Sequence, residues 1–210
     1  VGDDFQINPE EIEAKYFGVL TKLFNVARFA SQFDTPEDLD TTPSDLSVED
    51  RWILAEFSST MERTEDGWSN LDIYTATQAL KTFGTGVLPS HWLEMSKSRL
   101  YDGDVNAAWT IHRIVRDLMS ALSPVCPFFT HHISSTLYDK SAVDVREFPV
   151  RTPDDQSLRA LTSTIEDFNG ATWKTKKEAG LSLNAPIGGI VIPEELSEFT
   201  TILTQMHKLE

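Results

Sequence analysis

The chain has 210 residues, of which 40% are hydrophobic and 10% aromatic, enough for a folded core, and this excludes an intrinsically disordered protein. Its 33 acidic and 18 basic residues give a formal net charge of −15, which taken alone argues against binding a polyanion such as RNA. No apolar stretch reaches the roughly 20 residues of a membrane span, no signal peptide is recognisable, and the single cysteine, Cys126, excludes an internal disulfide and a multi-cysteine zinc site.

The acidic residues are concentrated near the start of the sequence. Residues 1–50 carry 12 acids and 3 bases, whereas the other 160 residues carry 21 acids and 15 bases. We interpret the concentration as a solvated acidic face, and a salt-loving source organism is an alternative explanation. The abrupt start at Val1 and the final Leu209-Glu210, which resembles a cloning-site scar, suggest an excised fragment of a longer protein.

Apolar residues at alternating three- and four-residue steps predict five amphipathic helices. In chain order they cover residues 12–30, 47–61, 73–87, 108–122 and 158–172. Ser47 is a good N-cap for the second, because Asp50 follows three residues later as in a capping box. An exposed acidic loop with two prolines is expected at 34–46, and a turn at 102–104.

The remaining elements are shorter. A helix is expected after Pro127, burying Phe129, Ile133 and Leu137. Residues 143–149 alternate as a short strand, and the apolar run 187–192 predicts a second one.

The expected fold is therefore mainly α. Amphipathic helices cover their apolar stripes best against one another, which predicts an antiparallel helix bundle over residues 1–178. Residues 179–208 are expected to begin a small, truncated α/β extension, with 209–210 as the scar.

No catalytic or metal-binding residue is predicted. Met95-Ser96-Lys97-Ser98 matches part of the ATP-binding signature of class I aminoacyl-tRNA synthetases, but Glu94 replaces its first lysine and the flanking pattern is helical. His131 and His132 are adjacent, so on a helix they point about 100° apart and cannot share one metal ion. We expect one of the two on the surface and the other near the bundle.

Three small basic clusters stand out against the acidic background. Their members are Trp173, Lys174, Lys176 and Lys177; Lys97 and Arg99; and Arg113 and Arg116. Each cluster has two interpretations: charge at a helix C-terminus or on a solvated face, or phosphate contact combined with base stacking on an aromatic ring.

Six segments, spread over roughly residues 15–193, resemble the region that follows the catalytic core in valyl-, isoleucyl- and leucyl-type class I aminoacyl-tRNA synthetases. In order they are KLFNVARF at 22–29, DRWIL at 50–54, LD…ATQAL at 71–80, WLE…KSRLY at 92–101, LSP…PF.T at 122–130 and KKEAGLSLNAPI at 176–187. The last, together with 143–149, is most similar to archaeal-type valyl enzymes. The sequence departs from the family at His131-His132, where a pair of glutamates is usual, and at 85–90, where a Trp/Phe-rich stretch is usual.

The resemblance implies an anticodon-binding domain of the class I synthetase type, without catalytic and editing domains. Its partners would be a valine-specific tRNA and the catalytic domain of the same chain; ATP with Mg and valine would serve the full-length enzyme. The protein would be cytoplasmic and monomeric, with no membrane partner. Candidate tRNA contacts are Trp173 for stacking and, for phosphates or bases, Lys174, Lys176, Lys177, Lys97, Arg99, Arg28 and Asn25.

Two alternatives remain open. The same domain could belong to an isoleucyl- or leucyl-tRNA synthetase. From another class, the chain could be a non-catalytic helical scaffold whose acidic face binds a basic protein. The position of a few basic side chains decides where a polyanion can bind. The net charge therefore predicts weak tRNA binding and does not exclude it.

Overall fold

The structure is a computed structural model that describes residues 9–138, 148–149 and 151–210, apart from the side chains of residues 11, 12, 14 and 15. Helices form nearly all the regular structure. In chain order they are α1 (Pro9–Ile12), the π-helical η1 (Glu13–Phe17), α2 (Gly18–Ala30), α3 (Val48–Ser69), α4 (Ile73–Thr82), the π-helical η2 (Phe83–Trp92), α5 (Leu93–Tyr101), α6 (Val105–Leu122), α7 (Pro127–Leu137), α8 (Gln156–Arg159), α9 (Thr162–Glu178), the 3-10 helix η4 (Glu194–Phe199) and α10 (Thr200–His207).

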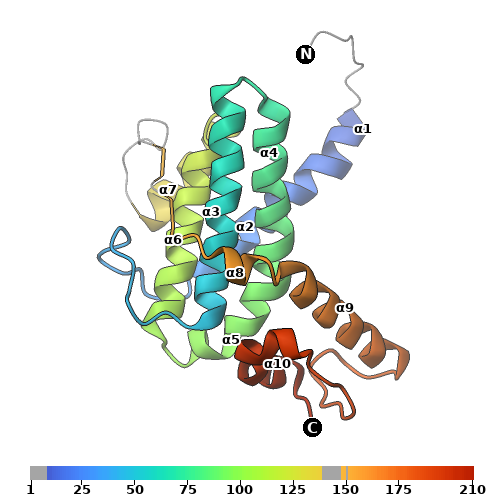
Figure 1. Ribbon diagram of the computed structural model, residues 1–210. Helices are drawn as coiled ribbons and strands as arrows, with labels where there is room; N and C mark the ends of the chain where they lie inside the picture. The colour runs from blue at the N-terminus through green and yellow to red at the C-terminus, as the bar shows by residue number, and fades with distance from the viewer. Residues whose placement is uncertain (1–8, 139–147, 150) are drawn as a thin grey trace.

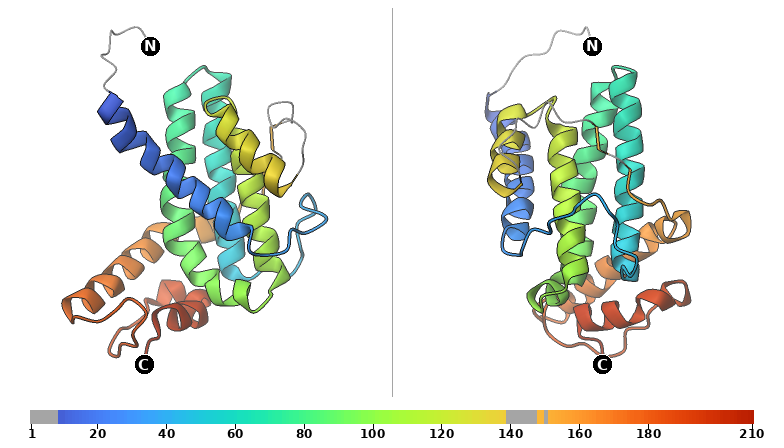
Figure 2. Two further views of the ribbon diagram at one scale, coloured as in Figure 1. Left: turned by 180° about the vertical axis from the view of Figure 1, so that it is seen from behind. Right: turned by 90° about the vertical axis from the view of Figure 1, so that its left-hand side faces the viewer.

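The bundle predicted from the sequence is confirmed. Helices α3 and α4 form a hairpin, and α4, η2 and α5 follow one another along the bundle beside α6 (Figure 1). Helix α2 crosses the opposite side, with α7 next to it (Figure 2). The core is filled by large apolar side chains from several helices, among them Trp52, Phe57, Phe83 and Trp92.

Local signals in the sequence set the helix starts. The Ser47 side chain accepts the backbone N–H of Asp50, as the capping pattern predicts. Asp104 caps α6 in the same way, accepting the N–H groups of Asn106 and Ala107. The loop at 34–46 is confirmed as a segment without helix or strand.

Gly84 brings α2 close to the bundle. A Cβ added there would lie 2.7 Å from Leu23 Cδ2 on α2 and 3.1 Å from Leu118 Cδ2 on α6. Five residues later Pro89 lies inside η2, where the backbone is π-helical and the Leu93 N–H bonds the Leu88 carbonyl. The sequence predicts an ordinary helix through residue 87; the widened turn and its proline were not expected.

The predicted fifth helix is interrupted, and this is a correction. Residues 156–159 form α8, a break follows at Ala160-Leu161, and α9 then points away from the bundle (Figure 1), with His207 of α10 packed against its side. The boundary predicted at residue 178 stays a prediction, although contacts of Lys176 described below cross it.

The strand predicted at 187–192 is wrong. Within the part of the chain that the structure describes, Ile187 makes one isolated parallel bridge with Leu209 and no strand forms. Gly189 adopts a positive φ of 77°, which breaks the extended backbone, while Ile190 and Ile192 pack against the core. The predicted strand at 143–149 lies outside the described residues except for 148–149, which are neither helix nor strand.

Candidate nucleic-acid interface

The outer face of α2 carries three hydrogen-bond donors in a row. Lys22, Asn25 and Arg28 are spaced three residues apart, so they lie on one side of the helix, and all three are exposed. The opposite side buries Leu23 and Val26 in the core. The family-like KLFNVARF segment therefore supplies both packing and an accessible polar face. Lys22 was not among the predicted contacts, although its spacing from Asn25 and Arg28 could have indicated it.

A hollow of about 320 Å³ lies between α2, η2 and α5. It brings together Asn25 and Lys97, both predicted from the sequence, and adds Lys22 and the hydroxyl-bearing Ser90. Lys97 also forms an ion pair with Glu94, another lining residue, so its charge is partly compensated. The 95–98 string lies inside α5, as predicted, and Met95 and Ser96 are buried.

A second hollow, of about 170 Å³, lies between α2 and α7. Arg28 of α2 and Ser31, the residue after α2, line it on one side, and His132 and Thr136 of α7 on the other. The two hollows flank the donor row on α2, one on either side.

Three long stretches of the sequence that contribute to the two hollows contain no acidic residue. Residues 14–33, 73–93 and 118–138 contain four basic residues and not one Asp or Glu, although 62 average residues of this chain would carry about ten acids. The other 148 residues carry 33 acids and 14 bases. The three stretches include α2, α4, η2 and α7, and α2 contacts η2 and shares a hollow with α7. Helices α2 and α7 and the π-helical η2 therefore carry none of the chain's acidic residues, and Glu94 of α5 is the one carboxylate that lines either hollow beside α2.

Arg99 is used inside the fold. Its guanidinium bonds Glu49 at 2.6 Å, Asp50 at 2.7 Å and Asp104 at 2.9 Å, which ties α5 to the starts of α3 and α6. Burial raises the pKa of Asp50 in spite of this arginine, and Trp92 Nε1 donates to the same carboxylate at 3.1 Å. With three carboxylates around it, Arg99 is a poor partner for a phosphate.

Lys176 is also used inside the fold. It is fully buried, and its ammonium donates to the carbonyls of Leu183 at 2.8 Å and His207 at 2.7 Å. Burial, helped by Lys208, lowers its pKa. The structure places this lysine between α9 and the C-terminal segment, where no tRNA phosphate can reach it.

The rest of the α9 cluster is more accessible. Lys174 and Lys177 are exposed, and Lys174 lies 3.9 Å from the carboxylate of Glu178. Trp173 is half-buried between two imidazoles, with ring centroids 5.8 Å from His91 and 5.6 Å from His207. Its neighbours therefore cover much of the ring that base stacking would need.

Arg113 and Arg116 hold the acidic loop on α6. Arg113 Nη1 donates to the carbonyl of Leu39 at 2.7 Å, and Arg116 Nη2 to the carboxylate of Asp40 at 2.8 Å. The solvated-face interpretation of this cluster is replaced by a structural one, because Arg113 is buried.

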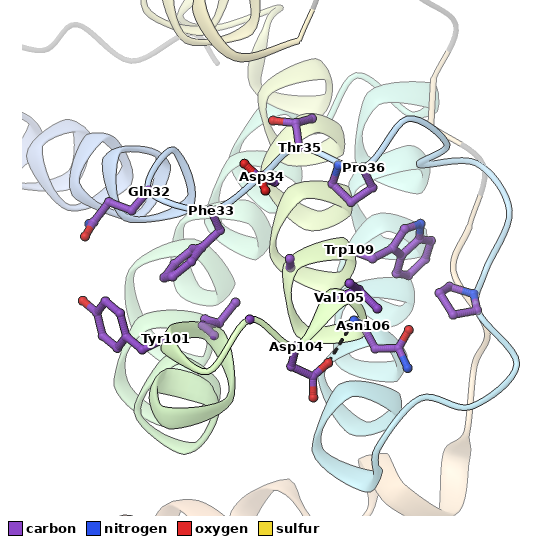
Figure 3. A pocket seen from close by; sticks show the side chains of 14 residues that line it. Gln32, Phe33, Asp34, Thr35, Pro36, Tyr101, Asp104, Val105, Asn106 and Trp109 are labelled. Carbon is purple, nitrogen blue, oxygen red and sulfur yellow. Dashed lines mark hydrogen bonds between the residues drawn. The ribbon is translucent and has the colours of Figure 1, made fainter.

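Another hollow, of about 630 Å³, lies beyond the C-terminal end of α2 (Figure 3). Phe33, Tyr101 and Trp109 line it together with the carboxylates of Asp34 and Asp104. The Asp104 carboxylate caps α6, as the dashed line to the Asn106 N–H marks. Acidic groups at this hollow repel phosphates, so it does not extend the basic face.

Two further findings limit the kinds of site. Among the described residues, no group of three His, Cys, Asp or Glu side chains is arranged to hold a metal ion. None of the helices in that part of the chain combines the length and apolar character needed to cross a bilayer.

Comparison with known proteins gives a consistent result. The family described as "Anticodon-binding domain of tRNA ligase" matches residues 50–192, about two thirds of the chain. Similar proteins are the valine–tRNA ligases of Saccharolobus solfataricus (32% identical over 190 residues, 89% of this chain and 22% of the relative), Pyrobaculum aerophilum (28% over 221 residues, 100% and 27%) and Haloarcula marismortui (27% over 210 residues, 99% and 23%). The chain thus spans about a quarter of the length of the curated relatives it matches.

Proposed function

The chain belongs to the family of anticodon-binding domains of tRNA ligases, and from this premise we propose that it binds the anticodon stem-loop of a valine tRNA. The observation that carries the proposal is the exposed donor row Lys22, Asn25 and Arg28 on α2, a helix without Asp or Glu; in the hollow beside it the one carboxylate of the lining, Glu94, is paired with Lys97. A polyanion binds favourably where basic side chains are exposed and acidic side chains are absent, whatever the net charge of the whole protein.

The chemistry of the face suits an RNA loop. Lys22 and Arg28 would contact phosphates and Asn25 a base edge, while Lys97 would contribute from the far wall of the hollow it shares with Asn25. Lys174 and Lys177 stay in the proposal as exposed cations on α9, with Trp173 as a partly covered stacking partner. Unpaired bases of a loop can be splayed out and held in this way, whereas bases in a duplex cannot.

In a full-length ligase this binding would act at a distance from the reaction. Binding energy gained at the anticodon favours the cognate tRNA over others before any bond is made. By analogy with relatives named valine–tRNA ligases, we propose that the full-length protein is such a ligase. That it uses ATP with Mg and is cytoplasmic and monomeric is proposed from the sequence resemblance alone.

The test is tRNA affinity by fluorescence anisotropy over a salt series. The 210-residue chain is expected to bind a valine tRNA at 50 mM salt, and the log of its affinity should fall linearly with log salt. Lys22→Glu with Arg28→Glu should weaken binding at least about tenfold and lower the salt slope by about two.

The matched control is Arg63→Glu. Arg63 is exposed on α3, the helix on the other side of the bundle from α2 (Figures 1 and 2), so its reversal should change affinity less than about threefold. Equal losses in the two variants would contradict the proposed face. No binding of any tRNA by a folded chain would favour the protein-interaction scaffold instead. Unchanged affinity for a valine tRNA carrying an isoleucine or leucine anticodon would remove the valine assignment.

A further inference from the structure

Helix α7 presents three π-systems on one exposed face. Phe128, His131 and His132 are spaced i, i+3 and i+4, so they lie together on the helix surface. All three are exposed, and Phe128 most of all, with 91% of its surface accessible. The helix is held by its other side, where Thr130 and Ile133 are buried. Both histidines are exposed, and His132, which lines the hollow beside α2, is the one that lies near the bundle.

The charge around this face suits a polyanion. Residues 118–138 contain no Asp or Glu, so no carboxylate lies on α7 or on the turn before it. An imidazole carries an N–H donor in either protonation state, and two adjacent ones can donate to phosphate or ribose oxygens. Because adjacent side chains on a helix diverge by about 100°, the pair does not offer one metal ion two ligands.

The α7 face is continuous with the donor row on α2. His132 and Thr136 line the hollow of about 170 Å³ whose opposite wall is formed by Phe24 and Arg28. Phe128 lies one helical turn before His132. An RNA strand bound along the α2 donors would therefore contact the two imidazoles and then the exposed ring of Phe128.

We infer that Phe128, His131 and His132 form a second contact surface for an unpaired nucleotide of the bound RNA, in which the base stacks on Phe128 and the imidazoles donate to its phosphate or ribose. The inference rests on the proposed function, since it takes the RNA to be the tRNA bound along α2. The nucleotide is unpaired because only a base released from its helix can place its face on a side chain.

Two variants test the surface. Phe128→Ala should weaken binding of the anticodon stem-loop at least about fivefold, the low end for one base–aromatic stack, and leave the salt slope unchanged because no ion is released. Phe128→Ala and the parent chain should bind an RNA duplex of equal length equally well. His131→Glu with His132→Glu should weaken stem-loop binding at least about tenfold, because the two new carboxylates repel the RNA phosphates.

Matched controls separate these effects from general ones. Val191→Ala truncates another apolar side chain that is 86% exposed. Gln156→Glu with Ser157→Glu adds the same two charges at adjacent exposed positions on α8, on the other side of the bundle (Figures 1 and 2). Both controls should change affinity less than about twofold, and circular dichroism should show all variants folded.

The outcomes distinguish the two proposals. If Lys22→Glu with Arg28→Glu weakens binding but the α7 variants bind as the parent does, the α7 surface is refuted and the proposed function stands. If Phe128→Ala weakens stem-loop and duplex equally, Phe128 holds no unpaired base and the inference fails. If the folded parent chain binds no tRNA at 50 mM salt, both proposals fall.

Discussion

His207 makes the attachment of the C-terminal segment sensitive to acid. The ring is fully buried at the end of α10; Nε2 lies 2.8 Å from Asn169 Oδ1, and Trp173 and Phe168 pack against the ring. Burial, with a smaller contribution from the Lys176 ammonium, lowers the pKa of this imidazole to about 4. An unfolded chain would protonate it near pH 6.5.

The sign and size of the effect follow from these two pKa values. Between about pH 6.5 and pH 4 the unfolded chain binds the proton and the folded chain does not, so stability falls as the pH falls through this window and levels off below it. At 1.36 kcal/mol per pKa unit, the folded state loses about 2 kcal/mol by pH 5 and about 3 kcal/mol by pH 4. Burial lowers the pKa of His91 as well, which acts in the same direction, while Glu166, 3.9 Å from His91 Nε2, would oppose it.

Urea unfolding followed by circular dichroism measures the effect, and His207→Gln isolates it. Glutamine keeps a side-chain N–H for Asn169 but does not titrate. The free energy of unfolding of the parent chain should drop by about 2 kcal/mol more than that of His207→Gln between pH 7 and pH 5. The other titrating groups are common to both proteins and cancel in the difference. Parallel pH profiles, within about 0.5 kcal/mol, would refute the argument that His207 is buried in its neutral form.

Three further changes probe the packing. Lys176→Met should leave tRNA affinity within about twofold in anisotropy but lower stability to urea by roughly 1–3 kcal/mol, because two buried carbonyls lose their donor; a tenfold loss of affinity would contradict its structural role. Arg99→Ala should cost about 3–5 kcal/mol in the same urea assay, since it leaves the buried Asp50 without its cation, and a loss under 1 kcal/mol would mean the pair is solvated. Gly84→Ala should cost about 1–3 kcal/mol by thermal or urea unfolding through its clash with Leu23, and a neutral result would show that α2 can shift outward.

The bundle was predictable because its signals are local. The helix starting at Ser47 and the helix after Pro127 each carry a cap or a proline together with a 3.6-residue pattern, and both appear in the structure at those residues. The break at Ala160-Leu161 was not predictable, because Leu158 and Leu161 continue the apolar pattern across it. The π-helical turn η2 depends on close approach at Gly84 and on tolerance of Pro89, both of which are properties of packing.

The candidate site was only partly predictable. Asn25, Arg28 and Lys97 were expected contacts, and the structure places them at the two hollows beside α2. Lys176 looked equivalent to Lys177 in the sequence, yet one is buried and the other exposed, since neighbouring residues on a helix face different ways. Which of the two lysines faces inward depends on where α10 packs against α9, and that packing cannot be predicted from a single sequence.

The contacts of the arginines show which feature of the charge pattern helps to locate a binding surface. In a chain this acidic, basic side chains form ion pairs within the fold. Arg99 pairs with Glu49, Asp50 and Asp104, and Arg116 pairs with Asp40. A cluster of basic residues in this chain can therefore be explained by structural ion pairs alone. The absence of acids is harder to explain by folding, because solvated acids cost a surface helix little. Long stretches without Asp or Glu, such as 14–33 and 118–138, are thus the better guide to where a polyanion can lie.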